Sequence, residues 1–86
     1  MKKQTTHFQV INKGIVFDFT EEPEGGYTVI IPSLPGCVSY GKTFEEAMKM
    51  IKDAMRGYLA VAKEEGILIP QEIEENKENV GFGLAF

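Results

Sequence analysis

The feature that most constrains the fold is a long amphipathic pattern between Thr43 and Gly66. Apolar residues recur there at spacings of three and four, which places them on one face of a helix. These residues are Phe44, Ala47, Met48, Ile51, Ala54, Met55, Tyr58, Leu59 and Ala62. Thr43 and Glu46 form a capping-box pattern at the start, and Gly66 is a typical helix end. The pattern predicts one helix whose broad apolar stripe lies against a sheet.

Short runs before the helix have the character of strands. Residues 13–22 alternate apolar and polar side chains, and residues 27–31 are rich in β-branched and aromatic residues. The loop between them is short, so we expect the two runs to pair as an antiparallel hairpin. Residues 37–40 are the expected third strand. Residues 6–11 are either a further strand or an extension of the first.

A turn with well-defined requirements separates the second and third expected strands. In the run Pro32–Cys37, Pro35 supplies the φ angle of the second turn position. Gly36 tolerates the positive φ angle that a type II turn needs at its third position. The sequence therefore predicts a chain reversal that leads into the third strand.

The segment after the helix has two parts. Residues 71–79 are acidic and polar, and we expect them to form a surface linker. Bulky residues then alternate with small ones, which predicts a final strand with one bulky face. The bulky residues are Val80, Phe82, Leu84 and Phe86, which we expect to form the oligomer contact of a homodimer or tetramer.

These elements predict an α+β domain of layout β-β-β-α-β. It consists of a three-stranded antiparallel sheet, one helix packed on the sheet, and a C-terminal strand. The chain has 86 residues, about the size of one small domain. We expect residues 13–86 to form that domain, with residues 1–12 as an N-terminal extension or extra strand.

Charge and composition exclude several classes of protein. Nine Lys and Arg against thirteen Asp and Glu give a net charge of −4, which argues against a general nucleic-acid binder. No apolar run approaches the roughly 20 residues of a membrane span, and the N-terminus lacks the apolar region of a signal peptide. We therefore expect a cytoplasmic protein. One cysteine and one histidine are too few for a usual four-ligand zinc site, and no cofactor is expected.

Residues that could carry chemistry also have plain structural interpretations. Cys37 has no base near it in sequence and is expected to be a small buried thiol, and His7 is expected to be solvated. Asp18 is the one carboxylate inside an expected strand, so a metal-dependent nuclease built on it is a further hypothesis. The helix also carries a basic stripe, which is either a solvated face or a docking site for an acidic surface or phosphate backbone. The stripe consists of Lys49, Lys52, Arg56 and Lys63.

Eight positions form a pattern that is specific enough to indicate a family. They are Tyr27, Pro32, Leu34, Pro35, Gly36, Cys37, Thr43 and Glu46. They belong to a Gly-Gly-Tyr strand entry, a Leu-Pro-Gly-Cys turn and a Thr-x-x-Glu-Ala helix start at fixed spacing. The run that contains them, Gly26–Ala47, closely resembles the HicB-like antitoxin family. With weaker similarity at the helix end, the resemblance extends over residues 13–70.

The resemblance implies both a fold and a role. The implied fold is described as a partial RNase H-like fold. The implied role is that of a non-catalytic antitoxin in a type II toxin–antitoxin system, which binds and blocks a small basic HicA-like toxin that cleaves mRNA. From charge alone we expect six acidic residues near such a toxin, namely Glu21, Glu22, Glu24, Glu72, Glu74 and Glu75.

One departure from the family concerns DNA binding. Many members continue into a helix-turn-helix or ribbon-helix-helix domain, whereas sixteen residues follow Pro70 here. We therefore expect no direct DNA contact by this chain. The alternative function is that of an orphan homo-oligomeric interaction or structural domain with the same fold and no toxin partner.

Overall fold

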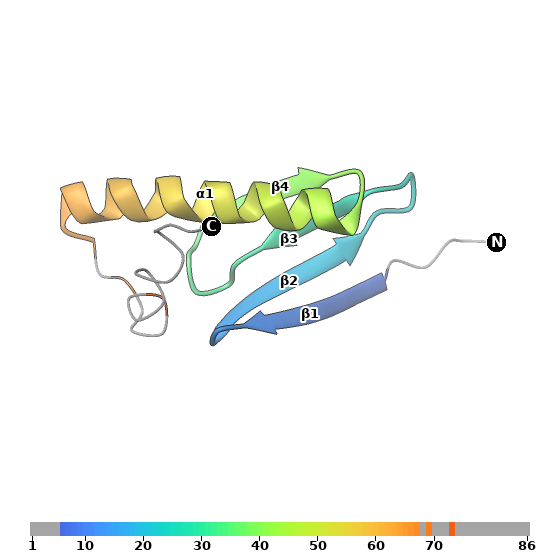
Figure 1. Cartoon of the computed structure of the whole chain (residues 1–86), viewed down its shortest axis with the longest axis horizontal. Helices are drawn as coiled ribbons and strands as arrows, with labels where there is room; N and C mark the ends of the chain where they lie inside the picture. The colour runs from blue at the N-terminus through green and yellow to red at the C-terminus, as the bar shows by residue number, and fades with distance from the viewer. Residues whose placement is uncertain (1–5, 68, 70–72, 74–86) are drawn as a thin grey trace.

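The chain folds as a four-stranded antiparallel sheet with one long helix packed across one face (Figure 1). The computed structural model describes residues 6–67, 69 and 73. The elements are β1 (Thr6–Asn12), β2 (Ile15–Glu21), β3 (Tyr27–Ile30), β4 (Val38–Gly41) and α1 (Phe44–Glu65). The strands lie in the sheet in chain order, so each strand pairs with its neighbour in sequence. The predicted α+β class and the predicted helix are confirmed.

The predicted count of three strands before the helix is wrong, because Thr6–Asn12 forms a strand of its own. This strand, β1, pairs with β2 along its whole length, from Thr6 opposite Glu21 to Asn12 opposite Ile15. The turn between them consists of Lys13 and Gly14, whose φ angles are 53° and 80°. A type I′ hairpin requires two positive φ angles. Lysine is not one of the residues from which such a turn is predicted in a sequence. The predicted final strand over residues 80–86 lies outside the described residues.

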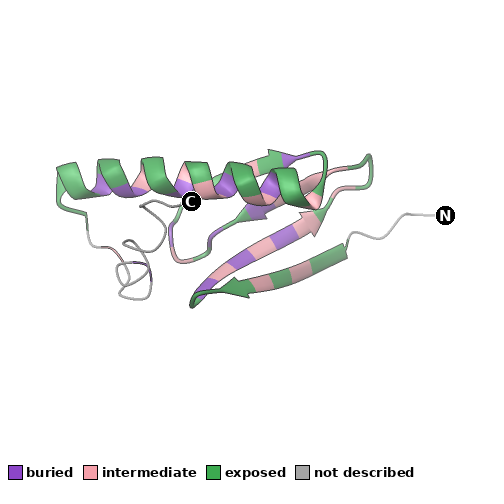
Figure 2. Ribbon diagram, in the orientation of Figure 1, coloured by how far each residue is buried: buried purple, intermediate pink, exposed green. Residues whose placement is uncertain are grey.

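The hydrophobic core lies between the sheet and α1. Along β2, every second side chain is buried, which confirms the alternation expected from the sequence (Figure 2). The buried core residues are Ile15, Phe17, Phe19, Val29, Ile31, Leu34, Cys37, Ala47, Ile51, Met55, Leu59 and Ile73. The helix residues among them belong to the predicted apolar stripe, and the rest of that stripe is at least partly buried. Throughout the text, the face of the sheet that packs against α1 is called the inner face, and the opposite face is called the outer face.

Both ends of α1 form as the sequence predicts, with one difference in detail. The Thr43 hydroxyl accepts a hydrogen bond from the Glu46 N–H at 3.0 Å. The Glu46 carboxylate accepts from the N–H of Lys42 at 2.7 Å, whereas the usual capping box would use the N–H of Thr43. At the other end, Gly66 has a φ angle of 72°, and Ile67 donates its N–H to the Ala62 carbonyl at 2.9 Å. These contacts satisfy backbone groups that a helix end leaves without partners.

Candidate partner-binding site

The Leu-Pro-Gly-Cys turn belongs to the fold rather than to an exposed site. The Cys37 N–H donates to the Leu34 carbonyl at 2.9 Å, and Gly36 between them has a φ angle of 88°. This is the hydrogen bond and the positive φ angle expected for a type II turn. Leu34 and Cys37 are both buried, so the turn is anchored in the core at its first and last residues. Pro35 and Gly36 remain exposed at its tip.

Replacing Gly36 with valine is expected to lower the free energy of unfolding by about 1–2 kcal/mol, because a side chain at positive φ is strained. A Cβ at this position would meet no atom within 4 Å, so the effect comes from the backbone and not from crowding. Gly36→Asn is the matched control, since asparagine adopts positive φ more readily. Urea unfolding should show that the original chain is the most stable, Gly36→Asn is less stable and Gly36→Val is the least stable. Equal stability of the valine variant and the original chain would contradict the turn assignment.

Cys37 is a buried thiol, as the sequence predicts, and it has the properties of a core residue. Burial raises the pKa of the Cys37 thiol, which disfavours the nucleophilic thiolate. His7, the one ring base of the chain, lies on β1 with its Nδ1 2.9 Å from the Thr20 hydroxyl. These observations place the His7 ring beside Thr20 and not beside the Cys37 thiol.

The raised pKa of Cys37 predicts how the free energy of unfolding depends on pH. Above about pH 8.5 an unfolded thiol loses its proton, while the buried thiol retains it, so unfolding releases a proton. The free energy of unfolding should therefore fall as the pH rises through this range, and the stabilisation is fully present at neutral pH. Cys37→Ala lacks the titrating group and is the control. Urea unfolding of both proteins between pH 7 and pH 10 measures the difference, and parallel curves would contradict it.

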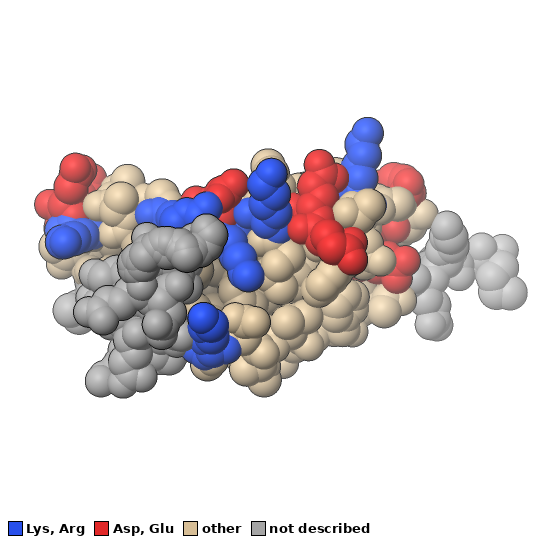
Figure 3. All heavy atoms as spheres, in the orientation of Figure 1, with Lys and Arg blue, Asp and Glu red and all other residues tan. Residues whose placement is uncertain are grey.

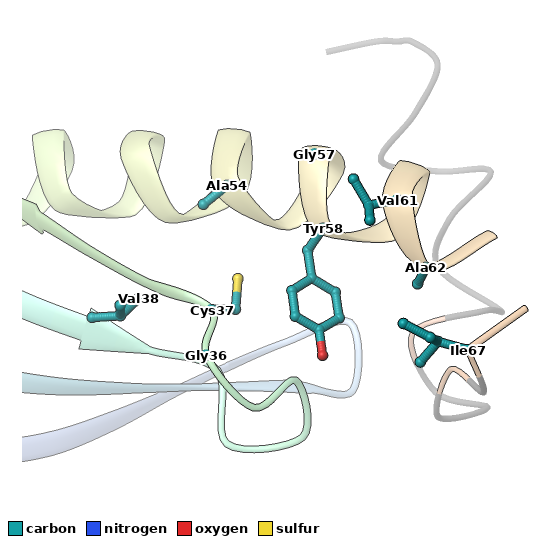
Figure 4. A pocket seen from close by; sticks show the side chains of 9 residues that line it. All are labelled: Gly36, Cys37, Val38, Ala54, Gly57, Tyr58, Val61, Ala62 and Ile67. Carbon is teal, nitrogen blue, oxygen red and sulfur yellow. The ribbon is translucent and has the colours of Figure 1, made fainter. Parts of the chain in front are cut away.

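An open apolar hollow of about 420 Å³ lies between this turn and the C-terminal half of α1 (Figure 4). It is lined by Gly36, Cys37, Val38, Ala54, Gly57, Tyr58, Val61, Ala62 and Ile67. The polar side-chain groups of this lining are the Cys37 thiol and the Tyr58 hydroxyl. The lining therefore offers apolar contact and no set of converging catalytic groups.

The acidic loop between β2 and β3 is built more firmly than its glycines suggest. Glu22 N–H donates to the Gly26 carbonyl at 3.0 Å, and Gly25 N–H donates to the Glu22 carbonyl at 2.9 Å. The Thr28 hydroxyl donates to a carboxylate oxygen of Glu22 at 2.7 Å. The Tyr40 hydroxyl donates to the Gly25 carbonyl at 3.1 Å. The loop that carries the predicted acidic residues is thus fixed by both β3 and β4.

Two residues of this arrangement, Thr28 and Tyr40, were not among the predicted site residues. They lie opposite each other in the β3–β4 register and both face away from α1. The alternation of their strands would have placed them on one face, but sequence alone does not show that this face borders the loop. The position of Tyr40 also explains why residue 26 is a glycine, because a Cβ at this residue would lie 2.1 Å from the Tyr40 hydroxyl oxygen.

The remaining predicted site residues lie in several places. Glu21 ends β2, and Glu24 is exposed in the loop. The other predicted partner-binding and oligomer residues, Glu72, Glu74, Glu75, Val80, Phe82, Leu84 and Phe86, lie outside the described residues. Asp18 lies on the outer face, and the described part of the chain holds no group of three or more His, Cys, Asp or Glu placed to bind a metal. No helix within residues 6–67 is long and apolar enough to cross a membrane.

The basic stripe is present on α1, where Lys and Arg side chains are seen along the helix (Figure 3). Lys49, Arg56 and Lys63 are exposed and Lys52 is half-buried. Arg56 forms an ion pair with Asp53 one turn earlier on the helix. The stripe is therefore interrupted by acidic charge, as is common on a solvated helix face.

Most of the chain matches a known protein family. The family described as the HicB_like antitoxin of bacterial toxin-antitoxin systems matches residues 15–84. The chain belongs to the HicB-like antitoxin family. The match contains the Leu-Pro-Gly-Cys turn and the helix start, on which the resemblance in the sequence rests.

Several curated relatives of this HicB-like chain carry the name UPF0150 protein. One from Thermoplasma acidophilum is 41% identical over 56 residues, which are 65% of this chain and 81% of the relative. One from Archaeoglobus fulgidus is 42% identical over 60 residues, covering 66% and 87% of the two chains. One from Helicobacter pylori is 39% identical over 62 residues, covering 62% and 86%. No solved structure matches significantly, and the likeness to an RNase H-like fold stays a prediction.

Proposed function

We propose that this chain is a non-catalytic antitoxin that binds and blocks a small basic HicA-like toxin, which cleaves mRNA. Membership of the HicB-like antitoxin family is the observation that carries the proposal. The firmly held acidic loop supports it, because the Glu22 carboxylate is held by Thr28 and Glu24 is exposed in the same loop. The antitoxin must act where the toxin meets mRNA, which places the proposed complex in the cytoplasm.

Charge explains how such a protein would find its partner. A protein that cleaves RNA needs a positive surface to hold the phosphate backbone. That same surface attracts an acidic protein, and this chain has a net charge of −4. Binding of the antitoxin and binding of RNA would then compete for one surface of the toxin.

The proposal is tested by recovering the partner and measuring what the chain does to it. Tagged protein is purified from the native host, and co-purifying proteins are identified by mass spectrometry. The expected partner is a small basic protein in stoichiometric amount that cleaves RNA when separated from the chain. Adding the purified chain back should stop the cleavage at a molar ratio near equivalence. Undiminished cleavage in the presence of excess chain would contradict the proposal.

The non-catalytic part of the proposal has its own measurement. The purified chain alone is incubated with RNA in the presence of Mg²⁺ or Mn²⁺. We expect no cleavage above that of a protein-free control. Metal-dependent cleavage that co-purifies with the chain and is lost in Asp18→Asn would instead support the nuclease hypothesis.

An orphan homo-oligomeric domain is the second candidate function. The observation that favours it is the alternation of Val80, Phe82, Leu84 and Phe86, which would present a bulky apolar face. We propose on this basis that the chain forms a homodimer or tetramer. Light scattering over a range of concentrations tests the oligomeric state, and a monomer at all concentrations would contradict it.

A further inference from the structure

The outer face of the sheet carries an apolar patch made by neighbouring residues of β3 and β4. Ile30 lies opposite Val38 in the register, and Thr28 lies opposite Tyr40. Val29, which lies between Thr28 and Ile30, is buried on the inner face, so the side chains of these four residues point outward. We call Ile30, Val38 and Tyr40 the outer patch. Val38 lies on the edge strand β4 and also borders the hollow between the Leu-Pro-Gly-Cys turn and α1.

All three residues of the outer patch are exposed to solvent. Val38 is 54% exposed, Tyr40 is 50% exposed and Ile30 is 39% exposed. Three such residues side by side form a contiguous apolar surface, and contiguous apolar surfaces on soluble proteins mark binding sites more often than single exposed residues do. Tyr40 is the aromatic residue of this surface, and aromatic residues are common anchors of protein interfaces.

The charged residues of the strands that form the outer face are of one sign. The four strands contain no Lys or Arg. Asp18 lies opposite Ile30 on the other side of β3, and the Glu22 carboxylate is held by Thr28, which lies opposite Tyr40. The basic stripe is carried by α1, and α1 packs against the inner face (Figure 1). A basic partner that approached the outer face would therefore meet carboxylates first.

The residues at the border of the patch are also fixed before any partner binds. The Tyr40 hydroxyl donates to the Gly25 carbonyl, and the Glu22 carboxylate accepts from Thr28. Side chains that are already held in one conformation lose less entropy on binding. The outer patch and its acidic border are thus arranged as a preformed surface.

We propose that the outer patch, bordered by Asp18 and Glu22, is the surface that docks the basic toxin. The proposal rests on the proposed antitoxin function and specifies where it acts. The complementary toxin surface has an apolar centre ringed by Lys and Arg. A second copy of this chain fits less well, because two outer faces in contact would bring the Asp18 and Glu22 carboxylates of both copies together.

A pair of matched variants tests the location. Ile30→Lys places a cation in the outer patch, opposite Asp18, where a strand can accommodate it. Ala60→Lys is the control, because Ala60 is an exposed apolar residue on the C-terminal half of α1. Both variants change the net charge equally, so a difference in their binding reports the position of the added charge. Circular dichroism melting and size-exclusion chromatography establish that each variant is folded and in the same oligomeric state as the original chain.

The readout is the Kd for the small basic toxin recovered by co-purification, together with the inhibition of its RNA cleavage. We expect Ile30→Lys to raise the Kd by at least about tenfold and Ala60→Lys to change it by less than about threefold. If the original chain blocks the toxin and both variants bind equally well, the docking surface is overturned while the antitoxin function stands. If the original chain does not bind the toxin, both proposals fail.

The acidic border has a kinetic test that does not depend on the apolar patch. Glu22→Gln removes one charge beside the patch, and Glu64→Gln removes one charge from an exposed site on α1. We expect Glu22→Gln alone to slow association with the toxin by about twofold or more at low salt, with the difference fading as salt rises. Equal rates for the two variants would overturn the role of the border. Concentration-dependent self-association that Ile30→Lys abolishes, with toxin binding unchanged, would assign the patch to a second copy instead.

Discussion

Gly41→Ala is expected to lower the free energy of unfolding by about 3 kcal/mol or more, because the new methyl group has no space. Gly41 is the last residue of β4 and is buried beneath the first turn of α1. A Cβ there would lie 2.2 Å from the Ala47 nitrogen and 2.6 Å from the Ala47 Cα. These are backbone atoms of the helix, so no side-chain rotation relieves the clash. The start of α1 would have to move away from the sheet.

Gly57→Ala is the matched control for this prediction. Gly57 lies within α1, and a Cβ there would meet no atom within 4 Å. Alanine in an exposed helix position is favoured over glycine by about 0.5–1 kcal/mol, so this variant should be more stable than the original chain. The same chemical change is thus expected to have opposite signs at the two glycines. Urea unfolding measures both, and a Gly41→Ala variant as stable as Gly57→Ala would contradict the close approach of β4 and α1.

The case of Gly41 shows what local pattern can and cannot predict. In the sequence, Gly41 is recognisable as the end of a strand before a helix cap. The capping pattern of Thr43 and the spacing of the helix stripe then place α1 across the sheet. What local pattern does not contain is how closely the two backbones approach, since this depends on the crossing of β4 and α1 in space. The glycine is needed for a tertiary reason that its neighbours in sequence do not reveal.

Strand β2 was predictable because its side chains alternate regularly between buried and half-buried positions. Strand β1 was not, because its pairing depends on the conformation of a turn. Ile15, Phe17 and Phe19 are buried on alternate positions, and this regularity is visible in the sequence. β1 is different, because its exposed and half-buried residues give a weak alternation. Its pairing depends on Lys13 taking a positive φ angle, which lysine seldom does. Weak periodicity and an uncommon turn residue together left the status of residues 6–11 open.

The acidic residues of the candidate site were predictable from the sequence, but the surface that they form with the outer patch was not. The acidic residues of the β2–β3 loop stand out in the sequence, and Glu22 is indeed held at the end of the sheet. Their relation to Ile30, Val38 and Tyr40 depends on strand register, because only the register puts Thr28 beside Tyr40. In the sequence, Gly25 and Gly26 do not predict a fixed conformation for this loop. The hydrogen bonds from Thr28 and Tyr40 fix it and connect it to the apolar outer patch.

Phe19→Ala is expected to be the most destabilising truncation in the core, with a loss of about 3–5 kcal/mol. Phe19 is fully buried on the inner face and stacks on Phe8 with ring centroids 5.2 Å apart. It also contacts Phe44 at 4.8 Å and Tyr27 at 6.4 Å, so one ring joins β1, β3 and α1. Truncation would leave a cavity among elements that meet through this side chain. A domain of this size has about 5–10 kcal/mol of stability, so the variant should lose a large fraction of it.

Phe17→Ala and Ile11→Ala separate the contributions to this effect. Phe17 is as buried as Phe19, but among the described residues it takes no part in the ring contacts of Phe19. Phe17→Ala should therefore be less destabilising than Phe19→Ala, by about 1 kcal/mol for the lost aromatic pairs. Ile11 is exposed, and its truncation should change stability by less than about 0.5 kcal/mol. Because β2 carries Phe19 on one face and Asp18 on the other, loss of toxin binding in Phe19→Ala should follow the loss of folded protein measured by urea unfolding. Toxin binding lost at full stability would show that the inner face takes part in docking, which contradicts its assignment to the core.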